Sequence, residues 1–205
     1  MKTMEPTAKK SFFQDPQHII ALGVTLISLC ALVVSIFQTK IMQEERQLIR
    51  EHAKASVWPH LSVGLSKSHS RVDGSLTKLE LNLQNDGVGP AIITDVRVRH
   101  KGEAVPHWWA LFELYDLPDT LSRGITNRTF SNSIIRGGEN AMVLSLEHNL
   151  PLAQYFFENL EHFSLEILYE SIYGDKWLLQ SDPDSDATRE VPSDTTFPEE
   201  EQFNS

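Results

Sequence analysis

Cysteine is nearly absent from this sequence, because Cys30 is the only one among 205 residues. No disulfide can therefore form within the chain, and the paired cysteines of zinc-binding and redox motifs are missing. Cys30 lies inside a long apolar run, where we interpret it as a buried apolar thiol. Leu29 precedes it at the position where a lipoprotein signal has Gly or Ala, which excludes a lipidation site.

The motifs that carry common enzyme chemistry are absent as well. The sequence contains no Gly-x-Ser-x-Gly elbow and no His-Glu-x-x-His zinc motif. His100 and His107 form a near pair, but a zinc site needs three or four convergent ligands. Residues 182–186 resemble the start of a calcium loop, yet Ala187 and Ser193 replace the Gly and Glu that this loop needs. We therefore predict no enzymatic activity, no metal and no cofactor.

Positive charge is scarce, with 18 Lys and Arg against 28 Asp and Glu and a net charge of -10. Nucleic-acid binding requires a basic face that neutralises phosphates, so we exclude it. Much of the imbalance lies in residues 181–205, where Arg189 is the only basic side chain among many acids and prolines. Such a segment buries too little apolar surface to offset its ordering entropy, and we predict a disordered acidic tail there.

Among the features that are present, an uncharged apolar run at residues 19–37 stands out. A helix needs about 20 apolar residues to cross the roughly 30 Å hydrocarbon core of a bilayer. Signal peptides have shorter apolar cores, of about 7–15 residues, followed by small residues at a cleavage site. Residues 37–40 contain no such site. We predict an uncleaved transmembrane helix at 19–37, preceded by a tail at 1–18, with the lipid bilayer as its surroundings.

The orientation of this helix rests on the charges beside it. Basic residues flank the run on both sides, at Lys2, Lys9 and Lys10 before it and at Lys40, Arg46, Arg50 and Lys54 after it. Because these totals are nearly equal, the positive-inside rule gives little information on the orientation. A short basic tail before an uncleaved apolar helix is typical of a signal-anchor. That arrangement favours a cytoplasmic tail and a domain outside the cytoplasm.

The helix is expected to continue through residues 38–56. This segment lacks Gly and Pro and is rich in good helix formers. Its apolar residues Ile41, Met42, Leu48 and Ile49 recur seven apart and share one stripe. A stalk and a short coiled coil with another chain are both compatible with this stripe. Because a coiled coil needs about three or four heptads and this segment has barely two, we favour the stalk.

From residue 57 the pattern changes to the alternation of β-strands. Leu79, Leu81 and Leu83 alternate with polar residues, and Thr94, Val96 and Val98 do the same. Further short alternating segments follow up to residue 180, separated by Gly-containing turns. Such segments are typical of an antiparallel sandwich or barrel. We predict one mainly β domain at 57–180.

Two short helices interrupt the β pattern, at residues 106–115 and 151–161. In the first, Trp108 shares a face with Leu111, Phe112 and Tyr115, whereas Trp109 points about 100° away from that face. Tryptophan is enriched at binding hot spots and in membrane interfaces. We take Trp108 and Trp109 as candidate partner-binding residues and expect Trp108 to be core and Trp109 to be exposed.

Residues 85–91 read Asn-Asp-Gly-Val-Gly-Pro-Ala and favour a turn. Gly87 tolerates unusual backbone angles, Pro90 stiffens the return to a strand, and Asn85 is able to bond to local backbone. Two glycines also suit the cradling of an anion, so Asn85, Gly87 and Gly89 are candidates for a ligand loop. A phosphate loop would add a Lys and a following helix, which are missing here. The structural turn is the favoured interpretation.

The chain resembles a group of uncharacterised bacterial single-span membrane proteins. The resemblance rests on the Trp-Pro-His-Leu segment at 58–61 after the apolar helix, on the turn at 85–91 and on the Tyr-Gly-Asp-Lys-Trp segment at 173–177. The turn is also similar to one in immunoglobulin-like bacterial adhesion-type modules. The resemblance implies an immunoglobulin-like β-sandwich and a bacterial inner (plasma) membrane, and it implies no activity.

These observations favour a membrane-anchored binding or accessory module with an unidentified protein partner, as part of a larger membrane complex. Two other functions stay open, a membrane sensor or effector that responds to a ligand and an enzyme of unrecognised type.

Overall fold

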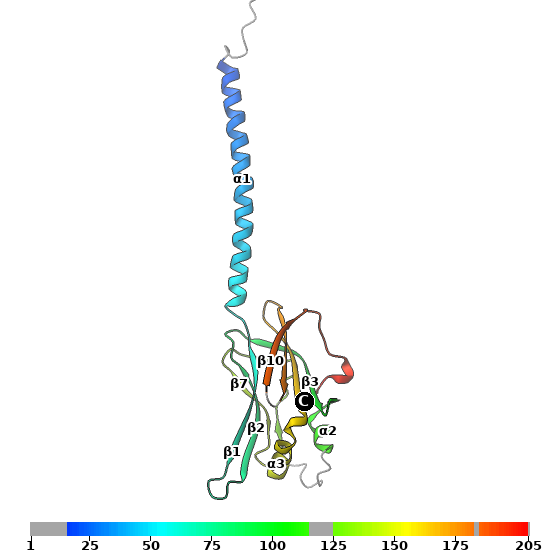
Figure 1. Ribbon diagram of the computed structural model, residues 1–205. Helices are drawn as coiled ribbons and strands as arrows, with labels where there is room; N and C mark the ends of the chain where they lie inside the picture. The colour runs from blue at the N-terminus through cyan, green and yellow to red at the C-terminus, as the bar shows by residue number, and fades with distance from the viewer. Residues whose placement is uncertain (1–15, 115–124, 183–184, 205) are drawn as a thin grey trace, which may run out of the picture. The chain divides into compact units, whose positions relative to one another are not determined.

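The computed structural model describes residues 16–114, 125–182 and 185–204 (Figure 1). The chain divides into two compact units, and the boundary lies between His52 and Ala53. The described part of the first unit is helical and that of the second is mainly β.

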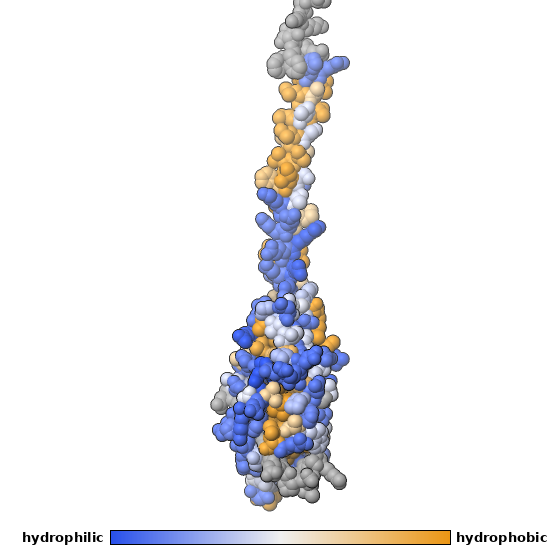
Figure 2. All heavy atoms as spheres, turned by 90° about the vertical axis from the view of Figure 1, so that its right-hand side faces the viewer, coloured by the Kyte–Doolittle hydropathy of each residue, from blue (hydrophilic) through white to orange (hydrophobic). Residues whose placement is uncertain are grey.

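Helix α1 spans Pro16–Ala55 without interruption, so the predicted membrane helix and the predicted stalk are parts of one helix. Figure 2 shows its hydrophobic part followed by a hydrophilic part. The hydroxyls of Thr25 and Ser28 donate to carbonyl oxygens one turn earlier, both at 2.8 Å, which satisfies these polar groups inside the apolar run. None of the helix's residues is buried, and the helix is long and apolar enough to cross a membrane.

The second unit contains two antiparallel sheets, which confirms the predicted antiparallel β architecture. The first sheet has four strands in the order β1-β2-β7-β5, which are Leu61–His69, Leu76–Asn85, Asn140–Ser145 and Thr126–Asn127. The second sheet has the path β10-β9-β8-β3-β4, which are Ser185–Val191, Lys176–Asp182, Phe163–Glu170, Ala91–His100 and Glu103–Val105. Strand β6 (Ile134–Ile135) also pairs with β3. The core lies between the two sheets.

The alternation of β2 is as predicted, with Leu79, Leu81 and Leu83 all buried. In β3 the prediction was wrong at one position, because Ile93 is buried together with Val96 and Val98 in place of Thr94. The pairing of β3 with β8 shifts register between Ile93 and Asp95. A bulge adds one residue to a strand and so reverses the inward and outward pattern on its two sides.

Both predicted short helices are present, although Tyr115 of the first lies outside the described residues. Helix α2 spans Trp108–Glu113 and α3 spans Leu150–Glu158, followed by the 3-10 turn η3 at Leu160–His162. Each begins at a side-chain cap. His107 Nδ1 accepts from the Ala110 N–H at 2.9 Å, and Asn149 Oδ1 accepts from the Leu152 N–H at 3.2 Å. Such caps satisfy the free N–H groups of a first helical turn.

The prediction of a disordered acidic tail at 181–205 was wrong for the described residues of that segment. Strand β9 continues to Asp182, β10 pairs with β9, and the 3-10 turn η4 follows at Glu199–Glu201. Phe203 is only 1% exposed and belongs to the main core. Its N–H donates to the Val96 carbonyl at 2.8 Å, on the edge of β3 between the residues paired with β6 and with β4. Buried aromatic surface therefore stabilises a segment whose composition suggested disorder.

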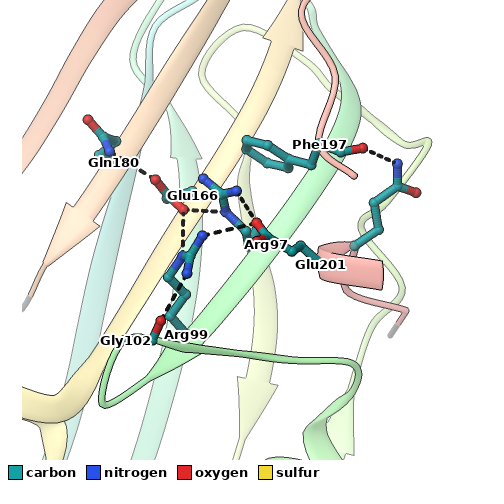
Figure 3. Close-up of polar contacts among 8 residues, drawn as sticks. Arg97, Arg99, Gly102, Glu166, Gln180, Phe197 and Glu201 are labelled. Carbon is teal, nitrogen blue, oxygen red and sulfur yellow. Dashed lines mark hydrogen bonds and ion pairs between the residues drawn. The ribbon is translucent and has the colours of Figure 1, made fainter. Parts of the chain in front are cut away.

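An ion network attaches the same segment to the second sheet (Figure 3). Glu201 forms ion pairs with Arg97 and with Arg99, the latter at 3.0 Å. Glu166 on β8 accepts from Arg97 at 2.5 Å and from Gln180 at 2.9 Å. Glu201 of the segment thus contacts the outward arginines of β3, which offsets part of the repulsion that the composition implies.

The pKa of Glu166 provides a test of this network. Burial raises the pKa of the Glu166 carboxyl, but the hydrogen bonds from Arg97 and Gln180 outweigh burial and hold the pKa below its ordinary value of 4.5. A carboxyl with a lowered pKa stabilises the fold above its unfolded pKa, and this contribution is lost as the pH falls through the folded pKa. We expect Glu166→Gln to lower the free energy of unfolding at pH 7, and this difference should shrink below pH 4.5. Urea titrations of both proteins between pH 7 and pH 3 would measure it, and a difference independent of pH would contradict the assignment.

Candidate functional site

The turn at residues 85–91 packs against another segment of the same chain, residues 57–60, and forms hydrogen bonds with it. Asn85 has 0% exposure, and its Oδ1 accepts from the N–H groups of His60 at 3.1 Å and Gly87 at 3.0 Å. Its Nδ2 donates to the carbonyl oxygens of Gly89 at 2.8 Å and Ile135 at 3.0 Å. One buried side chain therefore joins the turn to the start of β1 and to β6.

The backbone N–H groups of the turn also have hydrogen-bond partners within the chain. The N–H groups of Val88 and Gly89 both donate to the Trp58 carbonyl, at 3.1 and 3.4 Å. A Cβ at Gly89 would lie 1.8 Å from the Val57 carbonyl oxygen, so residues 57–60 fill the space beside the glycines. The N–H groups of residues 87–89 are thus paired within the chain and leave no donor for an anion. We interpret Asn85, Gly87 and Gly89 as structural residues, and the arrangement argues against a ligand loop.

The two adjacent tryptophans lie in different surroundings, as the helical geometry of α2 predicts. Trp108 is 2% exposed, and its ring is stacked with those of Phe112 and Phe163, both with ring centroids 6.3 Å away. Trp109 is 49% exposed. The role of Trp109 in partner binding stays a prediction, while Trp108 is a core residue.

We expect the two tryptophans to differ in their effect on stability. Trp108→Ala should lower the free energy of unfolding by about 3–5 kcal/mol, the range for truncation of a buried aromatic side chain. Trp109→Ala removes a half-exposed ring and should change it by less than about 1 kcal/mol. Urea unfolding followed by fluorescence of the remaining tryptophans would measure both. Equal losses would show that Trp109 is also a core residue and would remove its claim to a surface role.

A groove lies between the two sheets, beside the edge strand β1. It has a volume of about 320 Å³. Its apolar lining comes from both sheets and from η3, and consists of Val63, Leu65, Leu81, Leu160 and Phe163. Its polar lining comes from β9 and β10 and consists of Ser181, Asp182, Ser185 and Asp186. The groove therefore combines an apolar wall with two carboxylates.

Along the edge of β1 beside this groove, only some of the backbone N–H groups have a hydrogen-bond partner among the described residues. The Leu61 N–H donates to the Tyr169 hydroxyl at 3.5 Å, and the Val63 N–H donates to Asp186 Oδ2 at 2.7 Å. Both groups therefore point away from β2. Alternate residues of an antiparallel strand direct their N–H and C=O groups to the same edge, so Leu65 and Lys67 do this too. Within the part of the chain that the structure describes, the N–H groups of Leu65 and Lys67 have no partner.

Sequence patterns did not reveal this groove. Its carboxylates lie in the segment predicted to be a disordered tail, and β1 and β10 belong to different sheets. The alternation of Leu61, Val63 and Leu65 is the one local signal, because it predicts that these side chains face the interior. With serines and aspartates as its polar groups, the groove is suited to hydrogen bonding and to binding a cation.

Comparison with known proteins identifies no relative: no family model matches the chain, and no curated protein matches it.

Proposed function

We propose that this protein is a single-pass membrane protein whose β domain binds a protein partner, as an accessory module of a larger membrane complex. The observation that carries the proposal is the groove beside β1. There an apolar wall adjoins a strand edge whose N–H groups at Leu65 and Lys67 have no partner among the residues that the structure describes. Unpaired strand edges and apolar clefts are the features through which β domains bind other chains. Helix α1, with its uncharged apolar run, is suited to anchor the module.

The membrane setting is part of the proposal. We infer a bacterial inner membrane and an immunoglobulin-like sandwich, on the basis of the resemblance carried by residues 58–61, 85–91 and 173–177. The short basic tail before the helix favours a signal-anchor and a domain outside the cytoplasm. Protease added to spheroplasts should then digest the domain, and protection of the domain would place it in the cytoplasm.

Site-specific photo-cross-linking of the full chain in its native membrane tests the binding function. A photoreactive amino acid at Leu65 places the probe in the groove, and one at Trp109 tests the exposed tryptophan. Val72, which is 96% exposed in the turn after β1, is the control position. We expect a discrete cross-linked protein from the Leu65 position and none from the Val72 position. A product from Trp109 alone would move the binding surface to α2, and no product from either position would contradict the proposed function.

A further inference from the structure

We propose that the groove binds an extended peptide segment that pairs with β1 as an additional strand and carries an apolar residue and, two positions away on the same face, a Lys or Arg. This inference rests on the proposed function and specifies the chemistry of the partner at that site. Three properties of the groove support it, namely the outward N–H groups of Leu65 and Lys67, which have no partner among the described residues, the apolar wall and the carboxylates.

The edge of β1 can pair with an added strand only beyond the residues whose outward N–H groups are already bonded within the chain. Tyr169 and Asp186 already satisfy the N–H groups of Leu61 and Val63, whereas those of Leu65 and Lys67 are unpaired in the described chain. An added strand gains its hydrogen bonds from such alternate N–H and C=O groups. Lysine at a sheet edge commonly hinders pairing. Here the ammonium of Lys67 lies over the Phe157 ring of α3, 4.6 Å from its centroid, so this side chain is directed onto α3.

The wall of the groove selects an apolar side chain. Val63 and Leu65 share one face of β1, and side chains of an added strand that lie beside them point into the same space. Leu81 and Phe163 form further parts of that wall. The volume of about 320 Å³ is at the low end of the roughly 300–1,000 Å³ typical of ligand pockets. It therefore suits one or two side chains of a peptide better than a large cofactor.

The charge of the groove favours a basic side chain on the same face of the added strand, two positions from the apolar side chain. Asp182 and Asp186 both line it. Asp186 uses Oδ2 to accept from the Val63 N–H, which leaves its second oxygen for a ligand cation. The whole chain is acidic as well, with a net charge of -10. An acidic peptide would be repelled, and a Lys or Arg two residues from the apolar anchor would be attracted.

Peptide titrations against the full chain in phosphatidylcholine nanodiscs test the proposal. The probe is a fluorescein-labelled peptide in which Val and Lys alternate at every second position, with Ser between them, so that both side chains lie on one face. Empty nanodiscs control for binding to lipid. One matched peptide has Glu in place of Lys, and another carries N-methyl groups on the amides that would pair with β1. Fluorescence anisotropy should show saturable binding of the first peptide, and both matched peptides should bind at least about tenfold more weakly. Equal binding of all three peptides would overturn the proposal.

A pair of variants at Lys67 separates backbone pairing from the loss of a side chain. Lys67→Pro removes the outward N–H without removing a hydrogen bond to β2, whereas Lys67→Ala keeps that N–H. We expect the proline variant to weaken peptide binding at least about tenfold and the alanine variant to change it by less than about threefold. Asp182→Asn together with Asp186→Asn should remove the preference for the Lys peptide over the Glu peptide. Thermal unfolding of each variant would verify that the domain is folded.

The outcomes distinguish this inference from the proposed function. Equal binding by the Lys67→Pro and Lys67→Ala variants would contradict strand pairing. A change of oligomeric state in the proline variant, without a change in peptide binding, would show that the edge pairs with a second copy of this chain and would also overturn the inference. If the cross-link from the Leu65 position persists in either case, the binding function stands and only its peptide chemistry is wrong.

Discussion

Phe203→Ala should lower the free energy of unfolding of the β domain by about 3–5 kcal/mol, as truncation of a fully buried aromatic side chain does. The ring lies in the main core, 5.0 Å from the Trp108 ring in an edge-to-face contact. The Phe130 ring is 6.3 Å away. Removal of the Phe203 ring leaves a cavity between α2 and the sheets, because the aromatic rings around it belong to separate elements and are held by their own contacts.

Thermal and urea unfolding of the full chain would measure this loss, and Phe197→Ala provides the matched control. Phe197 belongs to a separate small cluster with Leu168 and Leu178 on the second sheet. Its ring also contacts the Arg97 guanidinium, at 4.1 Å from the ring centroid. We expect a smaller loss for Phe197→Ala, about 1–3 kcal/mol. An unchanged stability of the Phe203 variant would support the disordered tail that composition suggests.

A comparison of the acidic segment at 181–205 with β2 and α2 shows what local sequence is able to predict. The alternation in β2 and the helical spacing in α2 depend on neighbouring residues, and both predicted burial correctly. The acidic segment is stabilised by Arg97 and Arg99, which lie roughly a hundred residues earlier in the chain. The composition of a segment shows how many acidic residues it has, but not which distant basic residues they pair with in the fold. The useful signals were the two phenylalanines within an otherwise acidic segment and the two arginines that alternate on one face of β3.

Sequence patterns could not predict the groove for a related reason. Its walls depend on how the edges of two different sheets approach each other, and that approach is set by long-range contacts. The Asp186 side chain bonds to the backbone of β1 across more than a hundred residues of sequence. The turn at 85–91 gave a clearer signal, because an asparagine followed by two glycines suits a backbone contact as well as a ligand. Which of the two it serves depends on residues 57–60, and only the structure places them.

Gly89→Ala should be among the most destabilising single substitutions in the domain, at or above the upper end of the roughly 1–3 kcal/mol that overpacking costs. An added Cβ would lie 1.8 Å from the Val57 carbonyl oxygen and 2.4 Å from the carbonyl carbon. Both atoms belong to the backbone, which cannot move aside as a flexible side chain does. Residues 57–60 would have to leave the turn, and Asn85 would then lose its hydrogen bond from the His60 N–H.

Gly64→Ala is the control, because the space around Gly64 is open and its φ lies outside the positive range. There an added methyl group meets no atom within 4 Å, so the free energy of unfolding should stay within about 0.5 kcal/mol of its original value. Urea unfolding of both variants would compare them. A Gly89→Ala variant as stable as Gly64→Ala would show that residues 57–60 do not pack against the turn, and the glycines would again be candidates for a ligand loop. A large and selective loss at Gly89 would assign the turn to holding the segment that joins α1 to β1.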